Sequence, residues 1–258
     1  YLAGAWCWYL FNIVLLFGGF YYWGTRTWPE RRDRGTLALV FLAATPMMVG
    51  NFNNLQANPA VLGAMLWFVG YVLAGHYWRA TLVLTLAVYL KVYPLVLGLV
   101  FVMIYPKQLG WRLGFWLVAG ALLPFVLGPW DYVVQSYRDW GANLRADQRN
   151  TYDVATAYRD MALLWRVWGD RIYHGWLAWR QTAGGEAGAA ISTFSQTIYT
   201  SMQVISGGVI GLFALWLGWT KRGGAEAERA LGLLGLVIVW MMLWGPSTES
   251  ATYILLAP

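Results

Sequence analysis

The chain has 258 residues, of which 59% are hydrophobic and 12% are charged, and its formal net charge is +6. Most basic residues lie in short loops between apolar runs, which is typical of membrane topology and argues against a nucleic-acid-binding surface. A single cysteine, Cys7, excludes a disulfide framework within the chain. The 18 tryptophans and 16 tyrosines fit aromatic belts at membrane–water interfaces. We therefore predict an all-α, polytopic transmembrane helical bundle.

Residues 1–258 are expected to form a single membrane-embedded domain that is incomplete at both ends. The chain begins at Tyr1 and stops at Pro258, a few residues into an apolar run. We therefore expect further elements on both sides of this sequence.

Apolar segments follow one another along the chain. They lie near residues 3–23, 36–49, 59–75, 80–91, 94–105, 113–128, 197–219 and 230–244, and another begins at about residue 251. A helix needs about 20 residues to cross the hydrocarbon core of a bilayer. Several segments are shorter, so we expect half-crossing helices among the full spans.

One lysine, Lys91, interrupts an otherwise uncharged run over residues 80–106. An ionisable group at membrane depth costs roughly 2.5–3.5 kcal/mol, so it usually faces a polar cavity. Pro94 follows in the same run, and proline breaks helices and disfavours the helical conformation of the residue before it. We predict that one short helix ends near residue 91 and that another begins near residue 94.

Two topologies are compatible with this break. Residues 80–106 either cross the membrane once as a kinked helix or form a hairpin of two short helices that returns to its starting side. The hairpin places all the short-loop basic residues on one side, whereas a single crossing divides them equally. These residues are Arg26, Arg31, Arg32, Arg34, Arg79, Lys107, Arg112, Lys221, Arg222 and Arg229. The positive-inside rule favours the hairpin, with this basic side in the cytoplasm.

The polar segments then fall on the opposite, outer side. One is the turn over residues 50–58, with Asn51, Asn53, Asn54, Gln56 and Asn58, and another is the turn over residues 245–250, with Thr248 and Glu249. A long extracytoplasmic loop covers residues 129–196. Helical spacing of Trp and other apolar residues predicts at least two amphipathic helices along the membrane plane within 131–180. A flexible link is expected over residues 182–190.

These segments together resemble glycosyltransferase family 87, also known as the domain of unknown function 2029 family. The resemblance rests on the order of the GNFNNLQAN turn, a short apolar helix ending in Lys-Val-Tyr-Pro, an outer loop and a late GPSTES turn. It implies a membrane glycosyltransferase of the GT-C class in the cytoplasmic membrane. Such enzymes transfer a sugar, typically mannose, from a polyprenyl-phosphate carrier to a glycan or lipid acceptor at the outer face, for the cell envelope.

The resemblance also implies roles for particular residues. Lys91 falls on the family's lysine position and, with Tyr93, would bind the donor phosphate. Sugar or acceptor binding would fall to polar residues of the two turns, namely Asn51, Asn54, Gln56, Asn58, Thr248 and Glu249. The general base of this class is an Asp in the first outer loop, which here would precede Tyr1. The late turn departs from the family pattern, which often has His near the donor phosphate where this chain has Thr248, Glu249 and Ser250.

Each of these residues also has a purely structural interpretation. Lys91 could snorkel to the interface, Tyr93 could belong to the aromatic belt, and the asparagines could form a polar turn that caps the next helix. Glu249 could pair with Lys91 or be solvated. His76 and His174 have no second ligand at metal-binding spacing, so we expect no metal and no cofactor.

Two functions of other classes remain compatible with the sequence. A transporter or flippase of lipid-linked glycans would hold the phosphate on Lys91 without cleaving a bond, and a non-catalytic membrane subunit would need no such site. A transferase requires a further transmembrane helix and an outer loop with an Asp upstream of Tyr1. We expect the upstream sequence to contain them.

Overall fold

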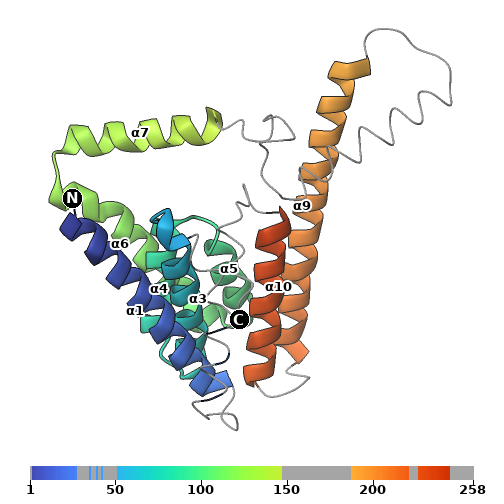
Figure 1. The fold of residues 1–258 in the computed structure, drawn as a ribbon. Helices are drawn as coiled ribbons and strands as arrows, with labels where there is room; N and C mark the ends of the chain where they lie inside the picture. Colours follow the sequence, from blue (N-terminus) through green and yellow to red (C-terminus); the bar gives the residue numbers. More distant parts are fainter. Residues whose placement is uncertain are drawn as a thin grey trace.

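The computed structural model describes residues 2–27, 51–146, 187–220 and 226–244, together with positions 35, 39 and 42. Within these residues the chain is helical and contains no strand, which confirms the predicted all-α bundle (Figure 1). Among the described residues, four helical stretches are long and apolar enough to cross a membrane. They are Leu2–Thr27, Pro106–Leu127, Tyr199–Trp219 and Glu226–Trp244.

Three apolar helices are shorter than a full span. They are α3 (Asn58–Leu73), α4 (Tyr77–Leu90) and α5 (Leu95–Ile104), with 16, 14 and 10 residues. A π-helical turn, η2 (Pro106–Gly110), then leads into α6 (Trp111–Leu127). Residues 106–112 were expected to be a loop, so the helix begins earlier than the sequence indicated.

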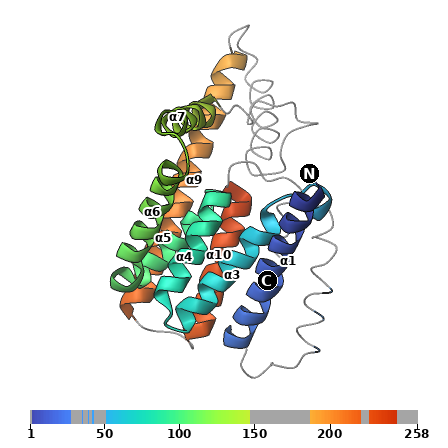
Figure 2. The same ribbon diagram turned by 90° about the vertical axis from the view of Figure 1, so that its left-hand side faces the viewer.

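The first helix, α1 (Leu2–Thr27), packs along α3 with both helices running in the same direction (Figure 2). Tyr9 lies beside Phe52 near the start of the pair, and Tyr22 stacks on Trp67 further along, with ring centroids 6.0 and 4.7 Å apart. The helices approach most closely at Gly19 and Gly63, where a side chain on either residue would overlap the other helix's backbone. The opposite face of α1 leaves apolar side chains exposed, as expected for a helix that faces lipid: Leu10, Val14, Phe17 and Tyr21.

The break at Lys91 forms the hairpin that the positive-inside rule favoured. Leu84 packs against Gly98, and each lies seven residues from Lys91. The ring of Tyr77, at the start of α4, lies 6.4 Å from the ring of Tyr105, just after the end of α5. Since the beginning of the first helix meets the end of the second, the chain returns to its starting side and the kinked single crossing is wrong.

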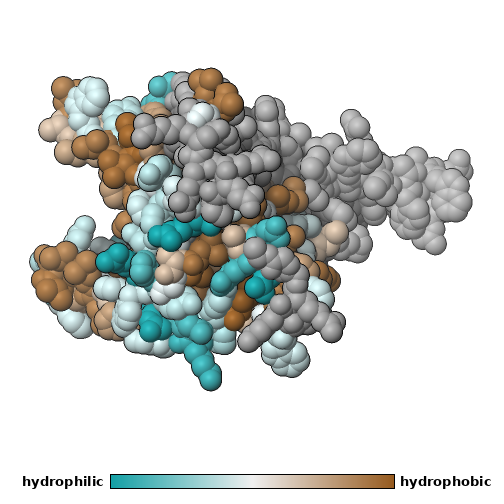
Figure 3. Space-filling view, turned by 90° about the horizontal axis from the view of Figure 1, so that it is seen from below, coloured by the Kyte–Doolittle hydropathy of each residue, from teal (hydrophilic) through white to brown (hydrophobic). Residues whose placement is uncertain are grey.

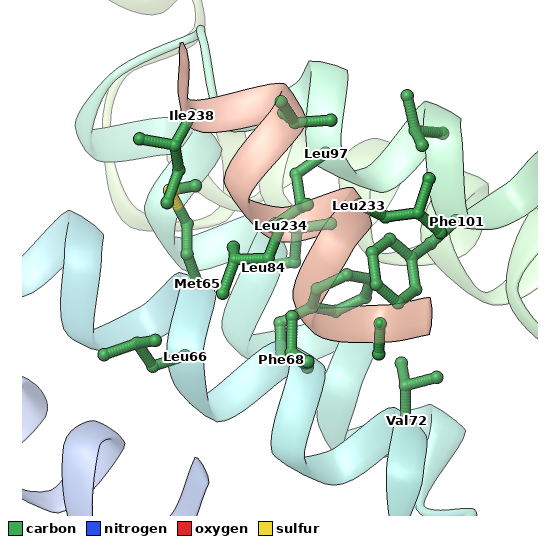
Figure 4. Close-up of a cluster of buried hydrophobic side chains, with 14 of the residues drawn as sticks. Met65, Leu66, Phe68, Val72, Leu84, Leu97, Phe101, Leu233, Leu234 and Ile238 are labelled. Atoms are coloured by element: carbon green, nitrogen blue, oxygen red, sulfur yellow. The ribbon is translucent and has the colours of Figure 1, made fainter. Parts of the chain in front are cut away.

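The remaining helices complete the bundle. The ring centroids of Trp78, at the start of α4, and Trp111, at the start of α6, lie 4.8 Å apart, so these helices begin at the same end. The helices α9 (Ala187–Thr220) and α10 (Glu226–Trp244) run antiparallel, with Tyr199 beside Trp244. Apolar side chains of α3, α4, α5 and α10 meet in the core (Figure 4), and these include Met65, Phe68, Leu84, Leu97, Phe101, Leu234 and Ile238.

The bundle has two chemically different ends. We call the end with the 91–94 break the tip end, and it also holds the turn over residues 51–58, the end of α6 and the end of α10. We call the other end the basic end, because five of the ten short-loop basic residues named above are described and all five lie there: Arg26, Arg79, Lys107, Arg112 and Arg229. Figure 3 views this end and shows several hydrophilic patches on it, with hydrophobic patches between and beside them. The hairpin topology predicted that all ten short-loop basic residues lie on one side, and the five that the structure describes do so.

One of the predicted amphipathic helices of the outer loop is present. The helix α7 (Trp130–Ala146) lies across the bundle axis at the tip end, and Figure 2 shows it end-on while the other helices run upright. Val133 is buried and Tyr137 donates a hydrogen bond to the carbonyl of Ala121 at 2.8 Å, while Arg138 and Asp139 are exposed. The second predicted helix, in 147–180, lies outside the described residues.

The expected flexible link over residues 182–190 is wrong at its end. Helix α9 already begins at Ala187, ten residues before the apolar segment from which its start was predicted. Alanine has the highest helix propensity, and three of the four residues 187–190 are alanine. Local propensity therefore extends the helix beyond its hydrophobic part.

The close approach of α1 and α3 yields a direct test. In Gly63→Ala the new methyl group would lie nearer than 3.0 Å to the backbone of Leu15 and Leu16. We expect the variant to lose about 1–3 kcal/mol of stability, the usual cost of overpacking, and to show a lower Tm in detergent. Gly208→Ala is the control, because nothing lies within 4 Å of the new methyl group. Equal Tm values for the two variants would contradict the close contact.

Candidate functional site

The tip of the hairpin is built from a helix end and a proline. Helix α4 ends at Leu90, and Lys91 has extended backbone angles (φ −153°, ψ 135°) while its N–H still donates to the carbonyl of Ala87 at 2.9 Å. Pro94 directly precedes α5, since a proline without an N–H is tolerated at a helix start. The predicted helix end and helix start are both confirmed, and Lys91 lies half-buried at the tip.

A chain of buried amides joins this tip to the turn over residues 51–58, which we call the asparagine turn. The Asn58 side-chain N–H donates to Asn51 Oδ1 at 3.0 Å, and neither residue is exposed to solvent. The hydroxyl of Tyr93 donates to Asn58 Oδ1 at 3.4 Å, which is a long hydrogen bond. The structure thus brings three of the predicted site residues together, from α3, the turn and the hairpin tip.

Burial divides the predicted polar residues of the turn into two groups. Asn51 and Asn58 are fully buried and bonded to each other, so they shape the turn. Asn53 and Asn54 are exposed and Gln56 is half-buried. The side chains of Asn54 and Gln56 are therefore accessible enough to contact a ligand. The two buried asparagines can influence binding only by shaping the turn that carries Asn54 and Gln56.

The capping interpretation of the asparagines is not what the structure shows. The residue that precedes α3 is Ala57, and it makes no side-chain cap. The N–H of Ala60 in the first turn of α3 instead donates to Oδ1 of Asn12, which lies on α1, at 3.0 Å. A helix start has unsatisfied N–H groups, and here a neighbouring helix supplies the acceptor.

Asn12 was missed by the sequence analysis, as was its neighbour Trp8. Asn12 is 1% exposed, and its N–H donates to the carbonyl of Trp8 at 2.9 Å, while the indole N–H of Trp8 donates to the carbonyl of Leu55 at 3.0 Å. A polar residue within an apolar segment is the same signal that drew attention to Lys91. Nothing in the sequence distinguished Trp8 from the other tryptophans, because the chain has 18 of them and most fit an aromatic belt.

Thr248 and Glu249 lie outside the described residues, so a pair between Glu249 and Lys91 stays a prediction. Within the described ranges, no group of three His, Cys, Asp or Glu side chains is arranged to hold a metal ion.

A second polar feature lies at the basic end, far from the tip along the hairpin. Tyr105 donates a hydrogen bond to Glu226 beside a small pocket between α5, α9 and α10. Burial, and then the hydrogen bond to Glu226, raise the pKa of Tyr105. The pocket is otherwise lined mainly by apolar side chains and includes none of the predicted site residues.

Comparison with known families decides the class of the protein. The model of glycosyltransferase family 87 matches residues 1–246. The chain belongs to glycosyltransferase family 87. The resemblance stated from the motifs is therefore confirmed, and the protein is a membrane glycosyltransferase with a sugar donor and an acceptor. The match covers the asparagine turn and the Lys91 tip. No curated protein and no solved structure matches the chain.

The buried amide pair predicts a difference between two variants. Asn51→Ala leaves the Asn58 N–H buried without its acceptor, which should cost about 1–3 kcal/mol. Tyr93→Phe removes only the 3.4 Å hydrogen bond to Asn58, so its cost should be smaller. Thermal unfolding in detergent would measure both. A Tyr93→Phe variant that loses more stability than Asn51→Ala would show that the amide pair does not hold the turn.

Proposed function

We propose that this member of family 87 is a GT-C-type hexosyltransferase that takes a sugar, typically mannose, from a polyprenyl-phosphate donor. The acceptor is a hydroxyl group of a glycan or lipid. The observation that carries the proposal is the position of Lys91, a cation at the tip of a hairpin too short to cross a membrane and next to the asparagine turn.

The length of the hairpin helices sets the depth of the site. With 14 and 10 residues, α4 and α5 rise about 21 and 15 Å, less than the roughly 30 Å hydrocarbon core. Non-helical backbone at membrane depth is tolerated only where protein surrounds it or where it lines a water-filled cavity. A lipid-linked phosphate, whose tail stays in the bilayer, suits such a place.

Each group at the tip has a task in the proposed reaction. The bond between the anomeric carbon and the phosphate oxygen breaks as the acceptor oxygen bonds to that carbon, and the acceptor proton passes to a base. Polyprenyl phosphate leaves with an additional negative charge. The ammonium group of Lys91 stabilises this developing charge, which a fixed cation does best in surroundings of low dielectric constant.

The remaining predicted residues bind rather than react. Tyr93, whose hydroxyl lies at the tip beside Asn58, is a second donor for the phosphate. The amides of Asn54 and Gln56 can both donate to and accept from sugar hydroxyl groups. Thr248 and Glu249 are proposed to add further sugar or acceptor contacts. No cofactor is required, because the lipid-linked donor is itself activated.

The proposed location is the cytoplasmic membrane, with the tip end on the outer face. The support is the gathering of Arg26, Arg79, Lys107, Arg112 and Arg229 at the opposite end of the described bundle. A lipid-linked donor would then reach Lys91 from the extracytoplasmic side, where cell-envelope acceptors are found. Membership of a glycosyltransferase family favours this reaction over movement of a lipid-linked glycan without bond cleavage.

Removal of the lysine charge tests the proposal. Lys91→Met keeps most of the side-chain volume and should lower turnover of a polyprenyl-phosphate sugar by about 10²-fold, comparable to the loss of one electrostatic stabiliser. Lys91→Arg should also lose activity, because the larger planar guanidinium donates in different directions. Transfer of radiolabelled mannose by full-length protein in proteoliposomes would measure turnover.

Lys107→Met is the matched control. It removes an exposed lysine at the basic end and should leave turnover within about twofold of the wild type. A Lys91→Met enzyme with near-normal turnover would reduce Lys91 to an interfacial anchor.

A further inference from the structure

The asparagine turn contains a strained residue. Leu55 has φ 51°, and it is the only residue other than glycine with a positive φ in the part of the chain that the structure describes. The left-handed conformation costs an L-residue about 1–2 kcal/mol, and glycine or asparagine adopts it far more easily. Such strain persists where the surrounding structure determines the conformation, and it clusters at ligand-binding sites.

Helix α1 holds this turn at Leu55 and holds the start of α3, directly after the turn, at Ala60. The indole N–H of Trp8 donates to the carbonyl of the strained Leu55 at 3.0 Å. Asn12 Oδ1 accepts from the N–H of Ala60 at 3.0 Å. The two anchors are themselves joined, because Asn12 donates to the carbonyl of Trp8 at 2.9 Å. Stacking on Phe11, with ring centroids 5.5 Å apart, orients the Trp8 ring.

Two of the predicted site residues, Gln56 and Asn58, lie between these two contacts, and Asn54 directly precedes Leu55. Gln56 directly follows Leu55, and its N–H donates to the carbonyl of Asn51 at 2.8 Å. Asn58 lies two residues before Ala60 and accepts from Tyr93 of the hairpin tip. The conformation imposed by α1 therefore determines where Gln56 is presented relative to the tip.

We propose that Trp8 and Asn12 are positioning residues, which hold the asparagine turn in its strained conformation so that Gln56 and Asn54 meet the sugar of the lipid-linked donor. This inference rests on the proposed function, since it assigns a purpose to the turn beside Lys91. Helix α1, which is long and apolar enough to cross a membrane, is then also part of the site's framework.

Trp8→Phe tests the inference with little disturbance, since it removes the indole N–H and keeps an aromatic ring. Loss of one hydrogen bond corresponds to about a 5- to 10-fold fall in kcat/KM, and we expect it chiefly as a rise in KM because the turn binds the sugar without reacting. The Tm should fall by no more than about 4 °C. Trp6→Phe is the control, because Trp6 lies on the same helix and is 67% exposed.

Leu55→Asn provides the rescue. Asparagine adopts the left-handed conformation at lower cost, so the turn should persist without the hydrogen bond from Trp8. The double variant with Trp8→Phe should therefore recover most of the lost kcat/KM. If Trp8 only stabilised the fold, Leu55→Asn would not restore the kcat/KM of the Trp8→Phe variant.

A labelling measurement reports on the turn without any substrate. In a Cys7→Ala background, Gln56→Cys places a thiol on the half-buried position after Leu55. Adding Trp8→Phe should raise the rate of labelling by a water-soluble maleimide about tenfold, and Leu55→Asn should lower it again. Adding Trp6→Phe should leave the rate unchanged.

The outcomes separate the inference from the proposed function. Unchanged labelling in Trp8→Phe, or faster labelling with unchanged kcat/KM, would overturn the positioning role. A wild-type enzyme that transfers no sugar from a polyprenyl-phosphate donor, but shows the expected labelling pattern, would contradict the proposed function and leave the hold of α1 on the turn supported.

Discussion

The structure depends on a hairpin that is too short to cross the bilayer. A pair of helices with 14 and 10 residues must reverse direction within the membrane, and the reversal exposes backbone polar groups that lipid cannot satisfy. Protein therefore has to surround the tip, and α3, α6 and the asparagine turn lie around it. Such a tip is also a place where a lysine can remain charged, provided that polar groups or an anionic ligand accompany it.

The glycine contact between α1 and α3 sets the arrangement of the polar groups at this end. Gly19 and Gly63 allow the two backbones to touch, which fixes the register of the parallel pair. Asn12 lies two turns before Gly19 on α1, and this register places its amide at the first turn of α3. Helix packing far from the tip therefore determines a hydrogen bond of 3.0 Å close to it. Gly63 thus contributes to the geometry of the site through the close helix contact that it allows.

Local features of the fold were predictable from the sequence, because they depend on chain chemistry alone. The break around Pro94 follows from the missing N–H of proline, and the hairpin follows from the distribution of basic residues between loops. Features that depend on tertiary packing were not predictable. The sequence did not show that Asn51 and Asn58 would both be buried, with the Asn58 side-chain N–H donating to Asn51 Oδ1. Asn12 could be recognised as unusual, but its partner on α3 depends on the register set by Gly63.

The most direct test of the account is to find where the donor phosphate lies. A polyprenyl phosphate with a photoreactive group next to the phosphate, bound to the full-length protein in nanodiscs and irradiated, would mark its neighbours for mass spectrometry. The account predicts adducts on residues 91–95 and 54–57, competed by unlabelled polyprenyl phosphate. Adducts confined to residues 105–112, or to the pocket beside Glu226 at the basic end, would contradict it.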